Sequence, residues 1–595
     1  MKKRIITILT VLCILFITAC REGSPATADP HNLEKRSVPV YCAQFQDFRD
    51  VSEQILIPEY TLYYADGVSD LPYVDLAEFV SLVNKVDQFD RNDLSGEQTV
   101  QEDYTVSADS TKDVFTYTYK PQGSDVIIDF RQGTLTYTCM DTFGKDPSYS
   151  VAEIQTNKLD FLQRIYDPRL SRYGGAQTIS LADYGIPMLI QDGKYLLPLH
   201  TAFDLLVWVP KAPYKIVCCN NAGIFVGHGN MFGYSDAPSE LGKIYYAQEP
   251  CSRSSQLAKY GYDELCMILD HFYGLKDSHH IRDFRGCLKN SGYEDRLLSE
   301  DPIAADQALL DIIRFTLDDF HSSYRVSSWM SGMDPDLKYE GNGLSFDILD
   351  KKKAEFNAAL AKSYSEYPAF YEEYGNTAYL TLFAMNTTVD SEQYYSLDTS
   401  DLENIDSGDV VMQILYADAQ INRENSPIQN VVIDLSLNSG GDVNSSAVLL
   451  SWLLGEGYIT LGNPSTGGLS VTKYRADINR DHRFDDADTI RGKKKLFCLI
   501  SPMTFSSANM AAGMLKNSGA VTVIGQQSLG GSGIVTPSVT GWDTVFVISG
   551  FRTVAAVKNG SWYDLDQGIT PDVYISDADL FYDRKQLTDL INDLK

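Results

Sequence analysis

The chain has 595 residues and a formal net charge of −30, and 44% of its residues are hydrophobic. Such a length is too great for one hydrophobic core, and it predicts about three domains. The strong negative charge disfavours nucleic acids and anionic membrane surfaces as partners, so no nucleic-acid role is expected.

The chain begins with a predicted export signal. Residues 1–19 contain three cations and then an apolar run, a pattern typical of a secretory signal peptide. The small residues before Cys20 resemble a bacterial lipobox, which implies that Cys20 bears lipid at the mature N-terminus; an ordinary signal peptide cut nearby and an uncleaved anchor are the alternatives. Polar residues 20–38 predict a flexible tether. The protein is therefore expected at the cell membrane, on the extracellular side or on a periplasmic face.

Residues 39–245 show mostly strand-like patterns and are predicted to form a β-rich N-terminal region. Two segments within it look alike, over residues 66–83 and 192–207, and each reads as a turn, a short strand and an amphipathic helix. They resemble the repeats of copper amine oxidase N-terminal-like modules, which implies a binding or spacer role without copper chemistry. His200, in the second segment, is isolated and is interpreted as a core or surface histidine.

Eight cysteines follow Cys20, and none forms a CxxC pair or lies near a histidine cluster at zinc-ligand spacing. They are interpreted as buried thiols with one or two disulfides. Cys251, Cys266 and Cys287 share one segment and are expected to pair most readily.

Residues 255–330 turn helical, and residues 331–595 then alternate strands with helices. Alternation of this kind predicts an α/β core with a largely parallel sheet and functional loops at the strand ends. The expected strands cover residues 376–386, 430–437, 495–501 and 521–525, and the expected helices cover 410–422, 444–455 and 507–518.

Ser506 stands where an apolar strand meets a helix that opens at about Ser507. Unpaired N–H groups and the helix dipole at such a place favour a developing anion, so Ser506 is a candidate nucleophile. A second strand ends in the run Asn438-Ser-Gly-Gly-Asp442, where Gly440 and Gly441 let the backbone approach a reacting carbonyl closely. Taken singly, each feature also fits a simple N-cap serine or tight turns.

A serine hydroxyl needs a base within hydrogen-bond reach, because it is a poor nucleophile at neutral pH. His321 follows a helix and precedes two serines, which makes it the leading candidate. The alternatives lie mid-helix, in a charged loop or in an acidic loop: His271, His279, His280 and His482.

Six motifs occur in a fixed order: LDDFHSSY, NTAYLTLF, VVIDLSLNSGG, TFSSANMAA, VIGQQSLGGSG and DQGITPD. Over residues 300–580 this order resembles the tricorn and C-terminal processing peptidases, serine peptidases with a crotonase-like, or ClpP-like, fold. The resemblance implies that Ser506 is the nucleophile and His321 the general base. It also implies that the amide of Ser507, with Gly440 or Gly441, holds the oxyanion.

The chain departs from the C-terminal processing branch at its base. That branch uses a lysine after the nucleophile helix, and Gly531 stands at the matching place. The departure favours the Ser/His form of the tricorn-like branch, in which an acidic residue before the terminal motif helps to orient the site. Asp566 and Asp564 both stand there, and spacing alone does not choose between them, although Asp566 is preferred.

Too few residues separate His321 from the strand at Asn376 for the PDZ module of many relatives, so the N-terminal region is expected to select substrates instead. Two further residues depart from the family pattern: Asn509 replaces a common glutamate in the nucleophile helix, and Phe320 replaces a small residue before His321. Both count against efficient catalysis.

Residues 477–488 have the oxygen spacing of an EF-hand-type loop, whose ligands suit a hard divalent cation. The loop resembles dockerin-like calcium sites but has His482 where glycine makes the turn, and an aspartate in place of a bidentate glutamate. It predicts a structural calcium ion, and a solvated acidic loop is the alternative. The candidate ligands are Asp477, Asn479, Asp481, the Arg483 carbonyl, Asp485 and Asp488.

The sequence therefore predicts a lipid-anchored serine endopeptidase that acts on protein or peptide substrates, meets the membrane through its N-terminal lipid and needs no cofactor for catalysis. The alternative is a catalytically silent surface protein that holds peptide or wall polymer.

Overall fold

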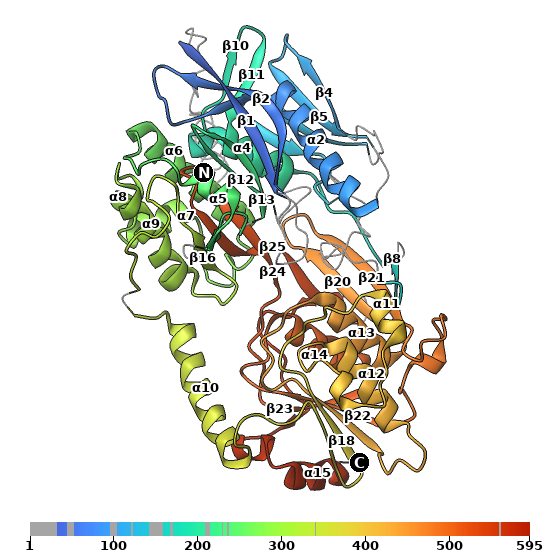
Figure 1. Ribbon diagram of the computed structural model, residues 1–595. Helices are drawn as coiled ribbons and strands as arrows, with labels where there is room; N and C mark the ends of the chain where they lie inside the picture. Colours follow the sequence, from blue (N-terminus) through green and yellow to red (C-terminus); the bar gives the residue numbers. More distant parts are fainter. Residues whose placement is uncertain are drawn as a thin grey trace, which may run out of the picture.

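The computed structural model describes residues 32–43, 53–95, 104–120, 123–141, 159–166, 170–208, 215–228, 230–234, 237–339, 341–558 and 561–594. The fold is mixed α/β, with the N-terminal sheets and a helical region at one end and the C-terminal α/β region at the other (Figure 1). The predicted signal peptide and the lipid-bearing Cys20 lie outside the described residues. None of the helices in the described part is long and apolar enough to cross a membrane.

Two sheets build the N-terminal part, one of seven strands in the order β10-β11-β3-β2-β1-β13-β12 and one of five strands in the order β4-β5-β6-β7-β9. Since β1 pairs with β2 from Leu33 onward, strand structure begins inside the segment predicted as a tether. The strands of the larger sheet are β1 (Leu33–Ala43), β2 (Glu53–Ala65), β3 (Tyr73–Asp75), β10 (Leu189–Gln191), β11 (Lys194–Pro198), β12 (Lys215–Asn220) and β13 (Gly223–His228). Those of the smaller sheet are β4 (Tyr104–Asp109), β5 (Val114–Tyr119), β6 (Ser124–Asp129), β7 (Thr134–Tyr137) and β9 (Gln177–Ser180).

The two similar N-terminal segments pair with each other. Each begins with an Asp-Gly turn in which both residues have positive φ, at Asp66–Gly67 and Asp192–Gly193. Such turns suit the twist of a hairpin. Each then gives a short strand and a helix, and the strands β3 and β11 lie antiparallel in one sheet. The helices of this part are α2 (Leu76–Ser95), α3 (Leu181–Tyr184), α4 (Leu199–Phe203), the π-helix η2 (Asp204–Trp208) and α5 (Glu240–Tyr245), and β14 (Gly233–Tyr234) with β15 (Ala237–Pro238) forms a small hairpin.

The predicted helical region contains α6 (Ser255–Phe272), α7 (Phe284–Asn290), α8 (Glu294–Leu297), α9 (Pro302–Asp311) and the π-helix η3 (Ile312–Leu317). Serine and aspartate N-caps begin α6, α7 and α9, because their side-chain oxygens accept from free amides of the first turn. After η3 the chain passes His321 and forms β16 (Ser323–Val326).

The six-stranded sheet of the C-terminal region confirms the predicted parallel pattern. Its order is β17-β18-β19-β22-β23-β27, and all pairs except β17 with β18 are parallel. The strands are β17 (Tyr371–Tyr374), β18 (Thr377–Thr381), β19 (Asn430–Asp434), β22 (Lys495–Ile500), β23 (Val521–Gly525) and β27 (Val573–Tyr574).

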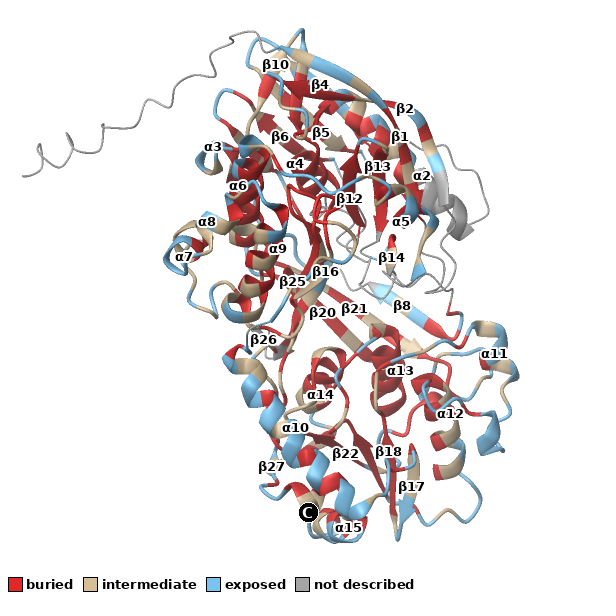
Figure 2. Ribbon diagram, turned by 60° about the vertical axis from the view of Figure 1, so that its left-hand side comes forward, coloured by how far each residue is buried: buried red, intermediate tan, exposed pale blue. Residues whose placement is uncertain are grey.

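Helices cover both faces of this sheet (Figure 2). In β19, Val431 and Ile433 join one hydrophobic core while Val432 joins another, because successive side chains point to opposite faces. The first face is covered by α12 (Val410–Ile421), α13 (Val443–Leu454) and α14 (Ser506–Ser518), and the second by α10 (Leu344–Ser363), η6 (Ala578–Phe581) and α15 (Arg584–Asp593). Two short helices, α11 (Ser391–Ser396) and η4 (Leu402–Asn404), lie in the connection between β18 and α12.

A further sheet crosses the predicted domain boundaries. In it β16, from the helical region, pairs with β25, and β8, from the N-terminal region, pairs with β21. One hydrophobic core also contains residues from both of those regions together with Val539, Phe546 and Phe551. The remaining strands are β8 (Leu162–Tyr166), β20 (Gly457–Asn463), β21 (Gly468–Ala476), β24 (Gly533–Val539), β25 (Val545–Lys558) and β26 (Ser561–Asp564).

The expected disulfides are wrong. All eight described cysteines are free, including Cys251, Cys266 and Cys287. Nearness in sequence did not bring these three thiols together, since Cys266 lies buried in α6 while Cys251 is exposed before it.

Candidate active site

Ser506 lies on a tight turn between β22 and α14 and has a left-handed backbone, with φ of +53°. This conformation costs a non-glycine residue roughly 1–2 kcal/mol, so its surroundings must hold it. The amide of Ser506 donates to the carbonyl of Gly530 at 2.9 Å, and the amide of Phe505 donates to the carbonyl of Asn438 at 3.1 Å. The turn thus exposes the Ser506 side chain at the start of a helix.

His321 reaches this turn from the helical region, where it follows η3. Its Nε2 lies 3.0 Å from Oγ of Ser506, although 185 positions separate the two residues. The imidazole also packs against the ring of Phe505, with 4.6 Å between ring centroids. With Nε2 unprotonated, the hydroxyl of Ser506 donates to it, which is the geometry that a base needs to activate a nucleophile.

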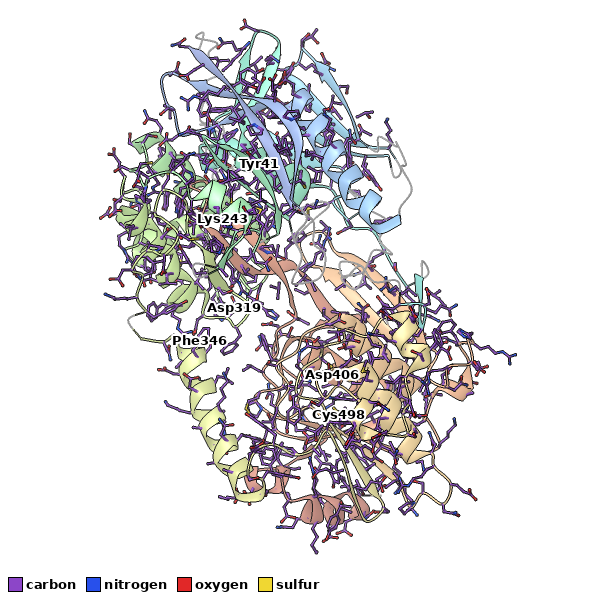
Figure 3. The ribbon with its side chains drawn as sticks, in the orientation of Figure 1. Tyr41, Lys243, Asp319, Phe346, Asp406 and Cys498 are labelled. Atoms are coloured by element: carbon purple, nitrogen blue, oxygen red, sulfur yellow. The ribbon has the colours of Figure 1, made fainter. Side chains whose placement is uncertain are left out.

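Asp319, labelled in Figure 3, is a buried carboxylate two positions before His321. One oxygen accepts from the backbone amides of His321 at 3.0 Å and Ser322 at 2.9 Å, and from the hydroxyl of Ser549 at 2.8 Å. The other oxygen accepts from the hydroxyls of Ser322 at 2.6 Å and Tyr273 at 3.0 Å. Because Ser549 lies on β25 and Tyr273 follows α6, Asp319 ties the His321 turn to two separate elements.

The two aspartates predicted to orient the site contact the loop after α14. Asp566 accepts from the amide of Ser532 at 3.1 Å, and Asp564 accepts from the hydroxyl of the same residue. Within the described residues, neither carboxylate is hydrogen-bonded to the imidazole, and Nδ1 of His321 meets no side-chain partner. Asp566 and Asp564 therefore contact the loop of Ser532 and not the imidazole.

Burial lowers the pKa of His321 below its ordinary value of 6.5, and the charge of Asp319 and the backbone of Gly533 oppose this shift. Burial raises the pKa of Asp566, and the negative charges of Asp564 and Asp319 raise it further. At neutral pH the imidazole is consequently neutral and able to accept a proton.

Backbone amides on and beside the Ser506 turn are the candidate oxyanion donors. The amides of Ser507 and Gly441 make no hydrogen bond within the described part of the chain, whereas the amide of Gly440 donates to the side chain of Asn438 at 2.8 Å. Gly440 lies so close to the turn that a Cβ there would stand 2.6 Å from Cβ of Ser506. Of the two glycines, Gly441 thus has the free donor, and Gly440 provides the close approach.

Gly531 occupies the position where the C-terminal processing branch has its lysine. A Cβ at Gly531 would lie 2.3 Å from the ring of Phe505, and the residue has φ of +85°. The ring that packs on His321 therefore fills the space that a side chain at position 531 needs.

A cavity of about 410 Å³ lies between α10 and the loops that lead to the site. Leu437 lies in the loop after β19, three positions before Gly440, and Met503 lies in the loop after β22, three positions before Ser506. Both residues line the cavity. The other described lining residues are Lys353, Asn357, Tyr367 and Phe383.

The acidic loop of residues 477–488 turns at His482, which has φ of +63° where glycine is usual. Its carboxylates accept from backbone amides: Asp477 from Asp481 and His482, and Asp488 from Asn479 and Asp485. Across the described ranges, no three or more His, Cys, Asp or Glu side chains form a group that could hold a metal ion. Calcium binding here stays a prediction.

The structure brings together the predicted Ser506 and His321, and it adds Asp319, which no sequence pattern singled out. The available signal was an aspartate two positions before the candidate base, because such a side chain can accept the amides that follow it. The partners of Asp319 on β25 and after α6 have no sequence signal, since they are more than 40 positions away.

Comparison with known proteins identifies one region. Residues 411–575 match the model of peptidase family S41, which confirms the predicted resemblance to the tricorn and C-terminal processing serine peptidases. No curated protein sequence matches the chain.

Solved structures show a weaker likeness. A photosystem II D1 C-terminal processing protease is 16% identical at a TM-score of 0.27, over 37% of this chain and 47% of its own. A lipoprotein from Streptococcus agalactiae is 15% identical at 0.34, over 57% and 97%. The tricorn protease is 11% identical at 0.30, over 94% and 58%. TM-scores of this size are too low to add to the family match.

The contact of Gly440 with the serine turn predicts a specific loss on substitution. Gly440→Ala places a methyl group against Cβ of Ser506, and we expect a loss of about 1–3 kcal/mol in the free energy of unfolding from overpacking, added to the cost of the positive φ. Urea unfolding followed by tryptophan fluorescence measures this loss.

Gly519→Ala is the matched control, because Gly519 also has a positive φ but has no atom within 4 Å of the added Cβ. Equal losses in the two variants would contradict the close approach at Gly440.

Proposed function

Because residues 411–575 match the model of peptidase family S41, we propose that the protein is a serine endopeptidase working through a Ser506–His321 pair. The observation that carries the proposal is the 3.0 Å separation between Oγ of Ser506 and Nε2 of His321. Its substrates are proteins or peptides.

In the proposed reaction, Oγ of Ser506 attacks the carbonyl carbon of the scissile bond while Nε2 of His321 takes the hydroxyl proton. The imidazolium then gives this proton to the leaving amine, which departs and leaves an acyl-enzyme. Water, deprotonated by the same imidazole, then attacks the ester carbonyl. The ester bond breaks, the imidazolium returns the proton to Oγ of Ser506, and the new carboxyl end is released. The lowered pKa of His321 suits the first step, since the base must begin neutral.

The oxyanion of the tetrahedral intermediate is proposed to lie against the amides of Ser507 and Gly441. Both donors are unused by the described part of the chain, and the start of α14 adds the favourable end of a helix dipole. The close approach of Gly440 to Ser506 brings the loop after β19 next to the serine turn, so that the amides of Ser507 and Gly441 can donate to the same oxygen.

Asp319 is proposed to position the base, because it accepts the amide of His321 and its charge raises the pKa of the imidazole. Its charge also stabilises the imidazolium that forms during the reaction. Asp566 and Asp564 are proposed to act on the loop of Ser532 rather than on the imidazole itself.

We further propose a crotonase/ClpP-like core without a PDZ module, an N-terminal region that contributes to substrate selection, and attachment to the cell membrane through lipid on Cys20, facing the outside or a periplasm. These proposals rest on the sequence patterns of residues 1–20, 66–83 and 192–207 and on the motif order.

Substitution of the nucleophile tests the proposed function. We expect Ser506→Ala to lower peptide hydrolysis by about a thousandfold or more and to abolish labelling by a fluorophosphonate probe, with unchanged circular dichroism. Labelling that persists in this variant would reject Ser506 as the nucleophile. A wild-type protein that resists labelling yet binds peptides saturably would favour the silent binding protein.

The pH profile tests the role of Asp319. We expect the acid limb of kcat/KM to lie below pH 6.5, because burial lowers the pKa of His321 and activity needs the neutral imidazole. Asp319→Asn removes a charge that raises this pKa, so the limb moves to lower pH while kcat falls at least about tenfold.

Asp566→Asn is the comparison, since its carboxylate contacts Ser532 and not the imidazole. An acid limb that moves in Asp566→Asn but not in Asp319→Asn would assign the orienting role to Asp566.

A structural calcium ion in the loop of residues 477–488 is also proposed, supported by the left-handed turn at His482. We expect calcium added to EDTA-treated protein to raise the unfolding temperature. At a calcium concentration a hundred times Kd, the free energy of unfolding should rise by about 2.7 kcal/mol. Asp477→Asn should abolish the gain and Asp486→Asn should keep it. Equal unfolding temperatures with and without calcium would leave a solvated acidic loop.

A further inference from the structure

The strand that follows His321 lies at the edge of its sheet. β16 begins two positions after His321, pairs with β25 and ends the strand order β16-β25-β20-β21-β8. No second described strand pairs with its outer side. An open edge of this kind presents unpaired N–H and C=O groups, which are able to bind another extended chain.

A cavity of about 870 Å³ reaches this edge. Four consecutive residues line it from the strand side: Tyr324, Arg325, Val326 and Ser327. Since neighbouring side chains on a strand point to opposite faces, a cavity that touches all four residues runs along the edge rather than over one face.

The walls of the cavity combine aromatic, aliphatic and polar residues. Its other described lining residues include Leu310, Leu337, Tyr246 and Tyr339. Arg325 is exposed, makes no ion pair with any described residue and is the only cation among the described lining residues. Asp334 also lines the cavity, from the connection that follows β16, and makes no ion pair with Arg325.

The guanidinium of Arg325 is open to a ligand, because it is exposed and makes no ion pair with any described residue. A planar guanidinium binds a carboxylate through two parallel hydrogen bonds, and tyrosines add contact area for an extended chain. The chemistry of this edge therefore fits a peptide that carries an acidic side chain.

We propose that the edge of β16 is a substrate subsite, where the peptide adds as a strand and places a Glu or Asp side chain against Arg325. The inference rests on the proposed peptidase function and names the class of peptide that the same site prefers. Continuity with the site supports it, because the strand begins beside the residue that contacts Ser506. Strand addition supplies affinity through the backbone, and Arg325 supplies selectivity.

The position of the acidic residue follows from the strand. Arg325 stands four positions after His321, but strand structure begins only at Ser323 and the register with β25 is irregular at Arg325, so the separation is at most about 13 Å at roughly 3.3 Å per residue. A peptide chain that runs beside β16 in register thus presents its acidic side chain about four residues from the bond that is cut.

Hydrolysis of short fluorogenic peptides tests the subsite. The peptides share one sequence and carry Glu, Gln or Lys at a single position that is scanned across them. In the wild-type full chain we expect Glu about four residues from the cut to raise kcat/KM about tenfold over Gln. The ratio should fall to about one in Arg325→Gln, and Arg325→Glu should reverse the preference toward Lys.

Arg282→Gln is the matched control, since it removes the same charge from a side chain that is 96% exposed on the helical region. Backbone pairing has a separate signature: N-methylation of alternate peptide amides should lower kcat/KM with a period of two residues. An equal rate for the Glu, Gln and Lys peptides, or a Glu preference that survives in Arg325→Gln, would overturn the subsite while leaving the peptidase function intact.

A binding measurement separates this inference from the proposed function. Fluorescein-labelled versions of the same peptides are titrated with Ser506→Ala protein and followed by anisotropy. Tighter binding of the Glu peptide that is lost in Ser506→Ala/Arg325→Gln supports the subsite even where the wild type hydrolyses none of the peptides. Equal binding of all three peptides to Ser506→Ala protein counts against it.

Discussion

The contact between Oγ of Ser506 and Nε2 of His321 depends on β25, a strand that contains neither residue. β25 pairs with β16, which follows His321, and with β24, which follows the loop that accepts the amide of Ser506. Ser549 on β25 also donates to Asp319, which holds the amide of His321. β25 therefore fixes the distance between the Ser506 turn and the His321 turn, which come from different regions of the chain.

A buried carboxylate is costly unless its oxygens are satisfied, and Asp319 meets this condition with five donors. The same donors fix the backbone around His321, because each one restricts where the carboxylate and its neighbours lie. Ser506 shows the complementary constraint, since its left-handed backbone is unfavourable in isolation and is held by hydrogen bonds from the turn to Gly530 and Asn438. The site thus combines a satisfied polar centre with a strained turn.

The sequence predicted the parallel sheet, the helices that cover it, and the positions of Ser506 and His321, because these depend on local periodicity and on motifs at strand ends. It did not predict that β8 joins β21 or that β16 joins β25, since pairing between distant segments leaves no periodic trace. The family resemblance placed the orienting aspartate near the terminal motif, at Asp566 or Asp564, and no sequence pattern singled out Asp319. Hydrogen bonds to Tyr273 and Ser549 mark out Asp319 only after the chain has folded.

The N-terminal region is joined to β25 by buried polar contacts as well as by a shared core. Asp543, in the turn before β25, accepts from the amide of Cys219 at 2.8 Å and lies 2.9 Å from Nε2 of His200. The charge of Asp543 raises the pKa of His200 against the lowering effect of burial, so the two side chains form a charge-assisted pair inside the protein. Thr201, next to His200, binds Glu264 of α6. The turn before β25 is thus fixed by contacts with the N-terminal region, and it cannot shift without them. The geometry of β25, and with it that of His321, therefore depends on the region that the sequence describes only as a binding or spacer module.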